Sequence, residues 1–370
     1  MKVGSVKEVK KHEYRVGLTP DNVREYISRG HEIFIQQGAG EGSTFSDEDY
    51  IAAGAKILPT AKEVWDCCEM IVKVKEPLAE EYELMRENQI IYTYLHLAAD
   101  RPLTEKLLEK KTKAVAYETI KDSKGGLPLL KPMSEVAGKL SIQAGARCLE
   151  KPMGGEGVLL GGVPGVPKSD VVIIGGGIVG ISALKMALGM GANVTILDNN
   201  LDRLSYLDDL YGQRIQTMFS TDYAIETAVS KADLVIGAVL IPGAAAPKLI
   251  KRSYLSKMRS GSVIVDVAVD QGGCCETTRA TYHDNPTYTI DGVIHYCVAN
   301  MPGCVSQTST IALTNATLNY GLRIASMGLE AAIANDPLFA LGVNCYRGHL
   351  TCEEVAHDFG MEYTDITTLI

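Results

Sequence analysis

The sequence predicts an α/β protein of two doubly wound domains, the N-terminal one discontinuous and completed by the C-terminal segment. A chain of 370 residues is too long for one ordinary core, and 46% hydrophobic residues suffice to fill two. Short β-rich runs alternate with helix-like segments in two separate sets, a pattern typical of βαβ units and parallel sheets. A glycine-rich linker, GGEGVLLGGVPGVPKSD, precedes the second set.

The first set alternates through the first third of the chain. Its β-rich runs are VGSV, HEIFIQ, EMIVKVKEP, QIIYTYLHL and KAVAYETI, with helix-like segments between them. In TPDNVREYISRG, Thr19 can cap a helix start, Pro20 suits its first position and Gly30 its end. The alternation of segments therefore indicates a parallel sheet, and the residues around Thr19 and Gly30 indicate where one of its helices begins and ends.

The second set follows a mostly helical region, residues 127–161. Its expected strands are DVVIIGG, ANVTILD, RIQTMF, ADLVIGAVL, SVIVDVAVD and YTIDGVIHYCV. A long amphipathic helical pattern then runs from about Thr308 to Ala334, and we expect it to return to the first domain. The predicted division is a substrate domain from 1–130 and 306–370, and a cofactor domain from 131–305.

Charge and cysteine usage narrow the class of protein. Lys and Arg number 36 against 45 Asp and Glu, a net charge of −9 that disfavours nucleic acid as a partner. Nine cysteines without C-x-x-C spacing, four of them in the adjacent pairs Cys67–Cys68 and Cys274–Cys275, do not form a disulfide framework or a zinc site. We therefore expect reduced thiols in the cytoplasm and no metal.

Neither an export signal nor a membrane segment is expected. The N-terminal MKVGSVKEVKKHEYR is charged throughout and lacks the apolar core of a signal peptide. The longest uncharged run, Val171 to Leu184, is shorter than the roughly 18 residues that a spanning helix needs, and glycines break it.

The stretch VVIIGGGIVG carries the first functional signal. Gly175, Gly177 and Gly180 form a G-x-G-x-x-G spacing between the strand DVVII and the helix IVGISALKMALGMG. Alone, this spacing also fits a tight turn inside a core. The strand–turn–helix order favours a Rossmann-like dinucleotide site, because the first glycine makes the turn, the second admits a pyrophosphate, and the third lets helix and strand pack closely.

Asp198 indicates which dinucleotide binds. It ends the strand ANVTILD about 20 residues after the glycines, where a carboxylate accepts hydrogen bonds from ribose hydroxyls and repels a 2′-phosphate. The alternative is a solvated strand end. Arg203 lies nearby and could accept a phosphate, but Asp198 sits at the strand end itself, so NAD is the predicted cofactor rather than NADP.

A series of motifs in fixed order covers the whole chain. They are KEVKKHEYRVGLTPDNV, VKVKEP, TYLHLAAD, KPMSEVAG, GGGIVG, DVAVDQGGC, and ANMPG with TSTIALTNAT. Together they resemble the alanine dehydrogenase family, which is related to the NAD-binding subunit of proton-translocating transhydrogenase. The sequence departs from the commoner family pattern at His12, Gly17, Cys304, Ser306 and Gln307.

The resemblance implies roles for individual residues. Arg15 and Lys75 would hold the substrate, His96 would be the acid/base, and Asp270 would assist at the reacting carbon. It also implies a homo-oligomer, generally a homohexamer, acting on small molecules. The implied cofactor site, together with the glycine loop, comprises Ser134, Gly175, Gly177, Ile178, Val179, Gly180, Asp198, Arg203, Ser220, Val239, Leu240, Arg279, Val298, Asn300 and Met301.

The chemistry of amino-acid oxidation can be matched to the same side chains. It requires a cation for the carboxylate, a base for the ammonium, and a hydride acceptor placed over Cα. The planar fork of Arg15 suits a carboxylate, although a surface arginine is the plainer alternative. Lys75 ends the apolar run MIVKVK, where α/β sites form, although an exposed strand-end lysine is as good an interpretation from sequence alone.

The proton-transfer candidates also follow predicted strands. His96 ends the apolar strand in IIYTYLHLAAD and has an ordinary pKa of roughly 6.5, which suits a base; a core histidine is the alternative. Asp270 is expected to end the strand GSVIVDVAVD, whereas Asp266 lies deeper and more plausibly serves structure. Glu118, which ends KAVAYE, is a weaker supporting candidate.

The predicted function is therefore the NAD-dependent, reversible oxidative deamination of L-alanine to pyruvate and ammonia. One alternative is an NAD(H)-binding transhydrogenase-like subunit, which needs no amino-acid site; Arg15, Lys75 and His96 together argue against it. A second is an opine- or saccharopine-type dehydrogenase, which the glycine loop alone does not exclude.

Overall fold

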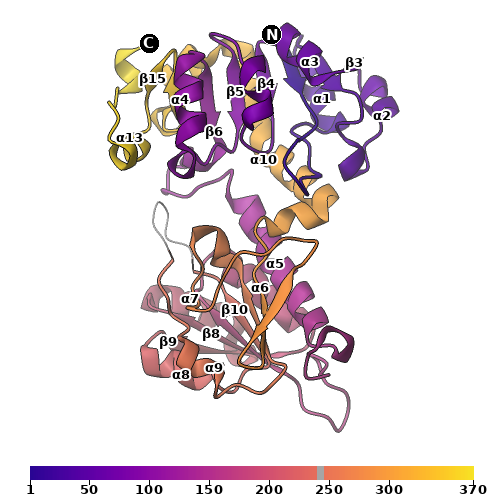
Figure 1. Ribbon diagram of the computed structural model, residues 1–370, viewed down its shortest axis with the longest axis vertical. Helices are drawn as coiled ribbons and strands as arrows, with labels where there is room; N and C mark the ends of the chain where they lie inside the picture. The colour runs from indigo at the N-terminus through magenta and orange to yellow at the C-terminus, as the bar shows by residue number, and fades with distance from the viewer. Residues whose placement is uncertain (240–245) are drawn as a thin grey trace. The chain divides into compact units, whose positions relative to one another are not determined.

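The chain divides into two compact units. The computed structural model describes residues 1–239 and 246–370. Unit 1 comprises Met1–Met133 and Gly303–Ile370, and unit 2 comprises Ser134–Pro302. In Figure 1 the C-terminal segment, in yellow, belongs to the same unit as the indigo N-terminus. The predicted discontinuity of the N-terminal domain is therefore confirmed.

Unit 1 is built on an eight-stranded sheet of order β15-β14-β6-β5-β4-β1-β2-β3. The strands from β3 to β6 are parallel, and β14 and β15 add an antiparallel edge. Chain order reverses between β1 and β4, which is the position where doubly wound folds bind ligands. The strands are β1 (Lys2–Ser5), β2 (Glu32–Gln36), β3 (Lys56–Leu58), β4 (Met70–Val72), β5 (Ile90–Thr93), β6 (Lys113–Ala116), β14 (Val343–Tyr346) and β15 (His349–Leu350).

Capping residues and glycines set the ends of the helices of unit 1. Thr19 caps α1 through the N–H of Asn22 at 3.3 Å, Pro20 is its first residue, and Gly30 follows it at φ 83°, as predicted. The predicted helix from Thr308 to Ala334 is two helices, because Gly328 breaks it at φ 86°. The helices are α1 (Pro20–Ser28), α2 (Asp47–Ala52), α3 (Ala61–Cys67), α4 (Arg101–Glu109), α10 (Ser306–Met327), α11 (Leu329–Asn335), α12 (Pro337–Ala340) and α13 (Glu353–Phe359).

Unit 2 repeats this architecture in a seven-stranded sheet of order β12-β13-β11-β10-β7-β8-β9. All strands but β12 are parallel, and the order again reverses, between β7 and β10. The strands are β7 (Asp170–Ile174), β8 (Asn193–Asp198), β9 (Ile215–Phe219), β10 (Leu234–Gly237), β11 (Val263–Asp266), β12 (Thr287–Ile290) and β13 (Val293–Tyr296). The helices are α5 (Lys131–Cys148), whose first turn belongs to unit 1, α6 (Ile178–Gly189), α7 (Leu201–Tyr211), α8 (Asp222–Val229) and α9 (Arg252–Leu255).

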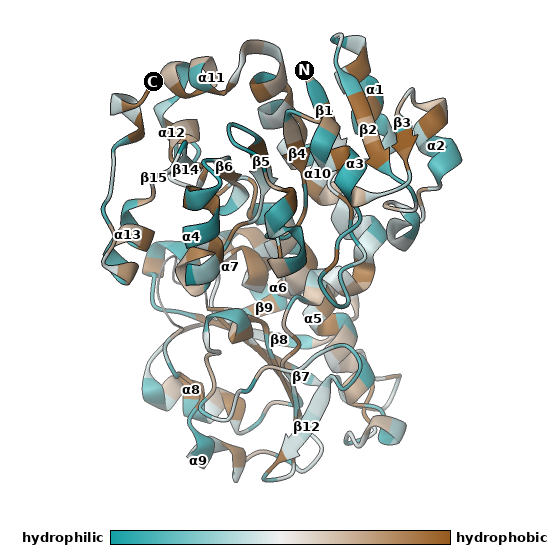
Figure 2. Ribbon diagram, turned by 45° about the horizontal axis from the view of Figure 1, so that its top comes forward, coloured by the Kyte–Doolittle hydropathy of each residue, from teal (hydrophilic) through white to brown (hydrophobic). Residues whose placement is uncertain are grey.

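Apolar side chains concentrate on the strands. In unit 1, Trp65, Ile71 and Ile91 are fully buried in one cluster, and in Figure 2 strands such as β4 are brown whereas α4 is partly teal and partly brown. Burial on both faces is expected for a parallel sheet covered by helices. No helix in the described part of the chain is long and apolar enough to cross a membrane.

Several strands are shorter than the sequence predicted. β4 ends at Val72, β5 at Thr93 and β11 at Asp266, although the apolar pattern continues beyond each of them. Polar side chains and neighbouring strands, rather than the apolar pattern, determine where the ladder stops. The residues beyond these ends form the loops that carry the candidate site.

Candidate active site and cofactor site

The three glycines of the G-x-G-x-x-G spacing after β7 have different physical reasons to be glycine. Gly175 has φ 103°, and a Cβ there would lie 2.6 Å from the carbonyl oxygen of Ala238. A Cβ on Gly180 would lie 1.8 Å from the carbonyl oxygen of Gly175. A Cβ on Gly177 would meet nothing within 4 Å in the described structure. Packing therefore explains the first and third glycines, whereas the second leaves open backbone that a ligand can approach.

The start of α6 is suited to an anion. Gly177 is its N-cap and contributes no side-chain hydrogen bond, so no side chain caps the first turn. The first N–H groups of a helix lack partners within the helix and carry partial positive charge. Backbone N–H groups at such a position are a common pyrophosphate site.

Asp198 has a second role that the sequence did not predict. Its Oδ2 accepts the N–H of Gly176 at 2.6 Å, and its Oδ1 accepts the N–H of Asn200 at 2.8 Å. The carboxylate thus anchors the glycine loop to the end of β8. Because each carboxylate oxygen has two lone pairs, these bonds leave capacity for a ribose hydroxyl.

Most other predicted cofactor residues lie at the carboxyl ends of the parallel strands of unit 2. Ser134 lies in α5 and Arg279 lies before β12, where it stacks 4.2 Å above the ring of Tyr288. Leu240 falls outside the described residues. The remaining residues are Ile178 and Val179 in the first turn of α6, Arg203 in α7, Ser220 after β9, Val239 after β10, and Val298, Asn300 and Met301 after β13.

The predicted position of Asp270 at a strand end is wrong. β11 ends at Asp266, and Asp270 lies four residues further on, exposed, in the short 3₁₀ helix Val267–Gln271. Asp266 is fully buried and accepts the N–H groups of Cys274 at 2.8 Å and Cys275 at 3.2 Å. Asp266 therefore closes the loop that carries Asp270.

The predicted substrate residues of unit 1 also gather at one sheet edge. Arg15 lies in the loop after β1, Lys75 after β4, His96 after β5 and Glu118 after β6. These four strands are consecutive in the sheet and parallel, so their carboxyl ends lie side by side. The fold thus brings together residues that are far apart in sequence.

Arg15 is not a surface arginine. Its side chain is 2% exposed, and Nε and Nη2 each donate to a carboxylate oxygen of Glu13 at 2.6 Å. Its Nη1 lies 3.0 Å from Sδ of Met133. Burial disfavours the charge, but the neighbouring Glu13 carboxylate outweighs it, so the pKa of Arg15 lies above its usual value. Glu13 was not predicted, and it occupies two of the five N–H groups of the fork.

Lys75 is half-buried, and in the described part of the chain only its backbone makes hydrogen bonds. Burial lowers the pKa of its ammonium; the charge of Glu76 opposes this, and that of Arg15 adds to it. A half-buried ammonium without a partner is costly unless a ligand pairs with it. Lys75 is therefore the better candidate for an incoming carboxylate.

His96 is neither a core histidine nor the last residue of a strand. β5 ends at Thr93, and the side chain of His96 is 45% exposed. Its backbone is left-handed, with φ 50° and ψ 38°, and its ring stacks on Tyr94 at a centroid distance of 5.8 Å. Partial burial lowers the pKa of His96, while the carboxylate of Glu118 raises it and Lys75 lowers it further. The ring is thus neutral near pH 7, as a base requires.

Glu118 holds His96 in this conformation. Its Oε1 accepts the N–H of His96 at 2.6 Å and that of Leu95 at 3.0 Å, and it lies 3.9 Å from Nδ1 of His96. A left-handed backbone at a residue other than glycine costs about 1–2 kcal/mol, and these bonds offset that cost. Glu118, a weak candidate from sequence, is a close neighbour of His96, the candidate base.

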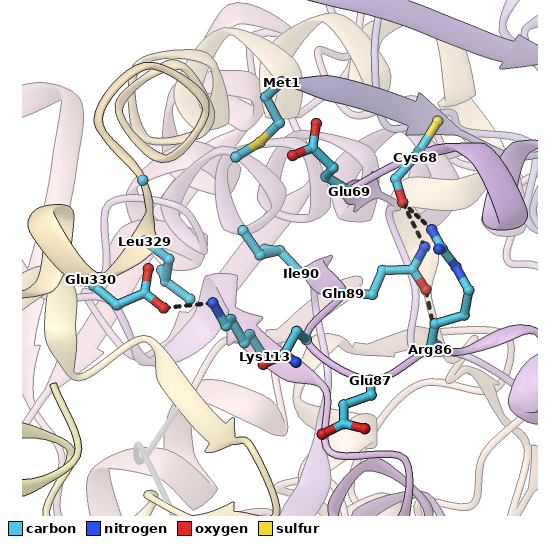
Figure 3. A pocket seen from close by; sticks show the side chains of 12 residues that line it. Met1, Cys68, Glu69, Arg86, Glu87, Gln89, Ile90, Lys113, Leu329 and Glu330 are labelled. Atoms are coloured by element: carbon cyan, nitrogen blue, oxygen red, sulfur yellow. Dashed lines mark hydrogen bonds and ion pairs between the residues drawn. The ribbon is translucent and has the colours of Figure 1, made fainter.

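A pocket opens at the opposite edge of the unit 1 sheet, where the strands begin (Figure 3). Lys113 pairs there with Glu330 at 2.5 Å, and Nη2 of Arg86 donates to the carbonyl of Cys68 at 2.6 Å. None of the predicted site residues lines this pocket. Because these charged groups pair with one another or with backbone, the carboxyl edge remains the candidate site.

These features define a two-unit α/β protein with a glycine-rich loop suited to a dinucleotide in one unit and a cluster of candidate substrate-binding residues, among them Arg15 and Lys75, in the other. The profile of the alanine dehydrogenase/PNT family matches residues 4–137 with its N-terminal domain and residues 141–353 with its C-terminal domain. The chain therefore belongs to the alanine dehydrogenase/PNT family, and the predicted resemblance is confirmed.

Individual relatives agree over the full length. The chain is 55% identical over 370 residues to an alanine dehydrogenase of Halomonas elongata, with 100% of both chains covered. It is 53% identical to a solved L-alanine dehydrogenase, with a TM-score of 0.95 and with 97% of this chain and 99% of that chain covered. A transhydrogenase of Sinorhizobium meliloti shares the fold at 22% identity, a TM-score of 0.82 and coverage of 95% and 98%.

Proposed function

We propose that this protein is an NAD-dependent L-alanine dehydrogenase that converts L-alanine and water reversibly to pyruvate and ammonia. The observation that carries the proposal is the half-buried Lys75 ammonium beside the neutral base His96, in a chain 55% identical along its length to an alanine dehydrogenase. A small substrate with a carboxylate and an adjacent ammonium matches these two groups in charge and function.

In the proposed mechanism Lys75 binds the substrate carboxylate, and Arg15 is the second cation assigned to hold the substrate. A charge-assisted hydrogen bond of this kind contributes roughly 1.5–3 kcal/mol. Lys75 and Arg15 also repel the substrate ammonium from the place where the substrate carboxylate binds. The two cations therefore fix the direction in which the amino acid binds.

His96 accepts a proton from the substrate ammonium, which leaves the neutral amine that can release hydride from Cα. Bound NAD supplies the hydride acceptor. Water then adds to the resulting iminopyruvate, and we assign the orientation of that water to Asp270 and His96. Pyruvate and ammonia leave, and the same groups act in reverse during amination.

The geometry of unit 2 supports our assignment of the cofactor residues. We assign the pyrophosphate to the open backbone at Gly177 and the first turn of α6, and the adenosine ribose to Asp198. Ile178, Val179, Ser220, Val239, Val298, Asn300 and Met301 complete the proposed site together with Ser134, Arg203, Leu240 and Arg279, as in the family pattern.

The test is NADH formation from NAD and L-alanine, run beside L-serine, 2-aminobutyrate and other amino acids. We expect the highest kcat/KM with L-alanine. Activity with another amino acid but none with L-alanine would redirect the function while leaving the fold unaffected. An opine-type enzyme would instead require pyruvate and an amino acid together, and a transhydrogenase-like subunit would bind NADH without any amino-acid reaction.

We also propose that the protein is a cytoplasmic homohexamer. All nine cysteines are free thiols, which suits a reducing compartment, and the hexamer is inherited from the family. Light scattering coupled to size-exclusion chromatography tests the second point. A mass of one or two chains would contradict the hexamer.

A further inference from the structure

Buried side chains hold the backbone around Lys75, in addition to backbone hydrogen bonds that join Lys73 and Val74 to the neighbouring β5 segment. Lys75 lies three residues beyond the end of β4. Oε1 of Glu8 accepts the N–H of Val74 at 2.7 Å and that of Lys75 at 3.4 Å. The hydroxyl of Thr93, at the end of β5, donates to the carbonyl of Lys75 at 2.9 Å. Both polar groups of the Lys75 backbone are thus bound by side chains, one from the loop after β1 and one from β5.

Glu8 is in turn fixed by a buried ion triad. Its Oε2 lies 3.1 Å from Nζ of Lys73, which also lies 2.9 Å from Oε1 of Glu81. Glu8 is 7% exposed, Lys73 fully buried and Glu81 2% exposed. The hydroxyl of Tyr117 completes the arrangement by donating to the carbonyl of Lys73 at 3.0 Å. Burying three charged groups is expensive, and apolar residues of similar size often give equal stability.

The two carboxylates of the triad differ in what they contact. Both pair with Lys73, but only Glu8 contacts the Lys75 segment, whereas Oε2 of Glu81 accepts the N–H of Leu78 at 3.1 Å. Lys73 is fully buried, whereas Lys75, two residues further on, is half-buried. The ion triad therefore anchors, through Glu8, the backbone of the segment that carries the proposed substrate cation.

We infer that Glu8, with Thr93 on the other side, is a positioning residue for the proposed reaction: it clamps the backbone of Lys75 so that the flexible ammonium meets the substrate carboxylate. The inference rests on the proposed role of Lys75. The Lys75 side chain has no partner in the described structure, and its four-carbon stem can adopt many rotamers. Fixing the Lys75 backbone therefore limits the positions that its ammonium can reach.

The decisive experiment compares Glu8→Gln with Glu81→Gln in the full-length enzyme. Both variants remove one negative charge next to Lys73 without changing side-chain size. Only the Glu8 carboxylate binds both Lys73 and the Lys75 backbone. Glu8→Gln replaces it with an amide, which has a single acceptor oxygen. We expect Glu8→Gln to raise the KM for pyruvate and for L-alanine about 10-fold, and Glu81→Gln to change it less than about 2-fold, with NADH affinity unchanged in both.

A double-mutant cycle with Lys75→Ala tests whether Glu8 acts through Lys75. In the Lys75→Ala background Glu8→Gln should have no further effect on KM. Independent, multiplying effects would overturn this inference alone, and so would equal KM changes in the two glutamine variants. Normal KM in Lys75→Ala would instead remove Lys75 from the proposed function, and this inference with it.

Thr93→Val provides a second test if Glu8→Gln does not fold. This substitution conserves volume at a fully buried position and removes only the hydroxyl that binds the Lys75 carbonyl. We expect a KM for pyruvate about 3-fold higher with NADH affinity unchanged. An unchanged KM in a folded Thr93→Val enzyme would overturn the clamp.

Discussion

Gly177→Ala separates the binding role of the glycine loop from its folding role. Gly177 has φ −72° and ψ −164°, a conformation open to any residue, and an added Cβ would meet nothing within 4 Å in the described structure. The substitution should therefore stabilise the protein slightly, by about 0.4–1 kcal/mol, through the unfolded chain. The same methyl group would occupy space that a pyrophosphate needs. We expect NADH affinity to fall at least about 10-fold, or about 1.4 kcal/mol.

Two variants in the same helix serve as matched controls. Gly189 also has no neighbour within 4 Å, but it lies at the far end of α6, so Gly189→Ala should leave NADH affinity unchanged. Gly180→Ala would bring a Cβ to 1.8 Å from the carbonyl oxygen of Gly175, which requires a backbone shift and should cost about 1–3 kcal/mol or more in stability. Thermal unfolding and NADH fluorescence titration give the two quantities. Wild-type NADH affinity in Gly177→Ala would refute the assignment of the loop to the pyrophosphate.

Three further predictions concern the proposed chemistry. His96→Ala should lower kcat for L-alanine oxidation by about 10²–10⁴-fold with unchanged NADH affinity, and near-normal turnover would exclude His96 as the base. Because burial lowers the pKa of His96, its neutral form persists below pH 6.5, so kcat/KM for L-alanine should decline only at lower pH. The carboxylate of Glu118 raises the pKa of His96, so Glu118→Gln should move that decline to still lower pH. A shift of the decline to higher pH would contradict this assignment. Asp198→Ala should reduce the preference for NAD over NADP and also weaken both, since Asp198 anchors Gly176; unchanged selectivity would remove Asp198 from cofactor choice.

Local sequence signals predicted the parts of the structure that depend on local physics. The cap at Thr19, the helix stop at Gly30 and the strand–turn–helix order around Gly175 each depend on a few neighbouring residues. The ends of the strands were predicted less well. The apolar pattern of MIVKVK continues past Val72, the last residue of β4, and the segment beyond it is buried with Glu8, a distant residue that accepts the N–H of Val74.

The partners of the site residues were missed for a related reason. Glu8 and Lys73 are 65 residues apart, and nothing in either motif indicates that they pair. Glu13 lies two residues from Arg15, yet the sequence equally allows both side chains to point to solvent. Charged residues inside apolar or strand-flanking runs, such as Lys73, are the only signal available, because a buried charge requires a partner of opposite sign.

The two units solve the problem of anion binding in different ways on the same strand order. In unit 2 the chain passes directly from β7 into α6, so the glycine loop presents backbone N–H groups and a helix N-terminus to an extended pyrophosphate. In unit 1 the equivalent connection from β1 to α1 is the longer loop of residues 6–19, which carries Glu8, Glu13 and Arg15. Under the proposed function, side-chain cations then take the part of the helix N-terminus, with Arg15 paired to the buried Glu13 and the Lys75 backbone bound by the buried Glu8. Such an arrangement suits a small carboxylate substrate, since a charge fixed at one point discriminates by position, whereas a row of backbone N–H groups accepts a longer ligand.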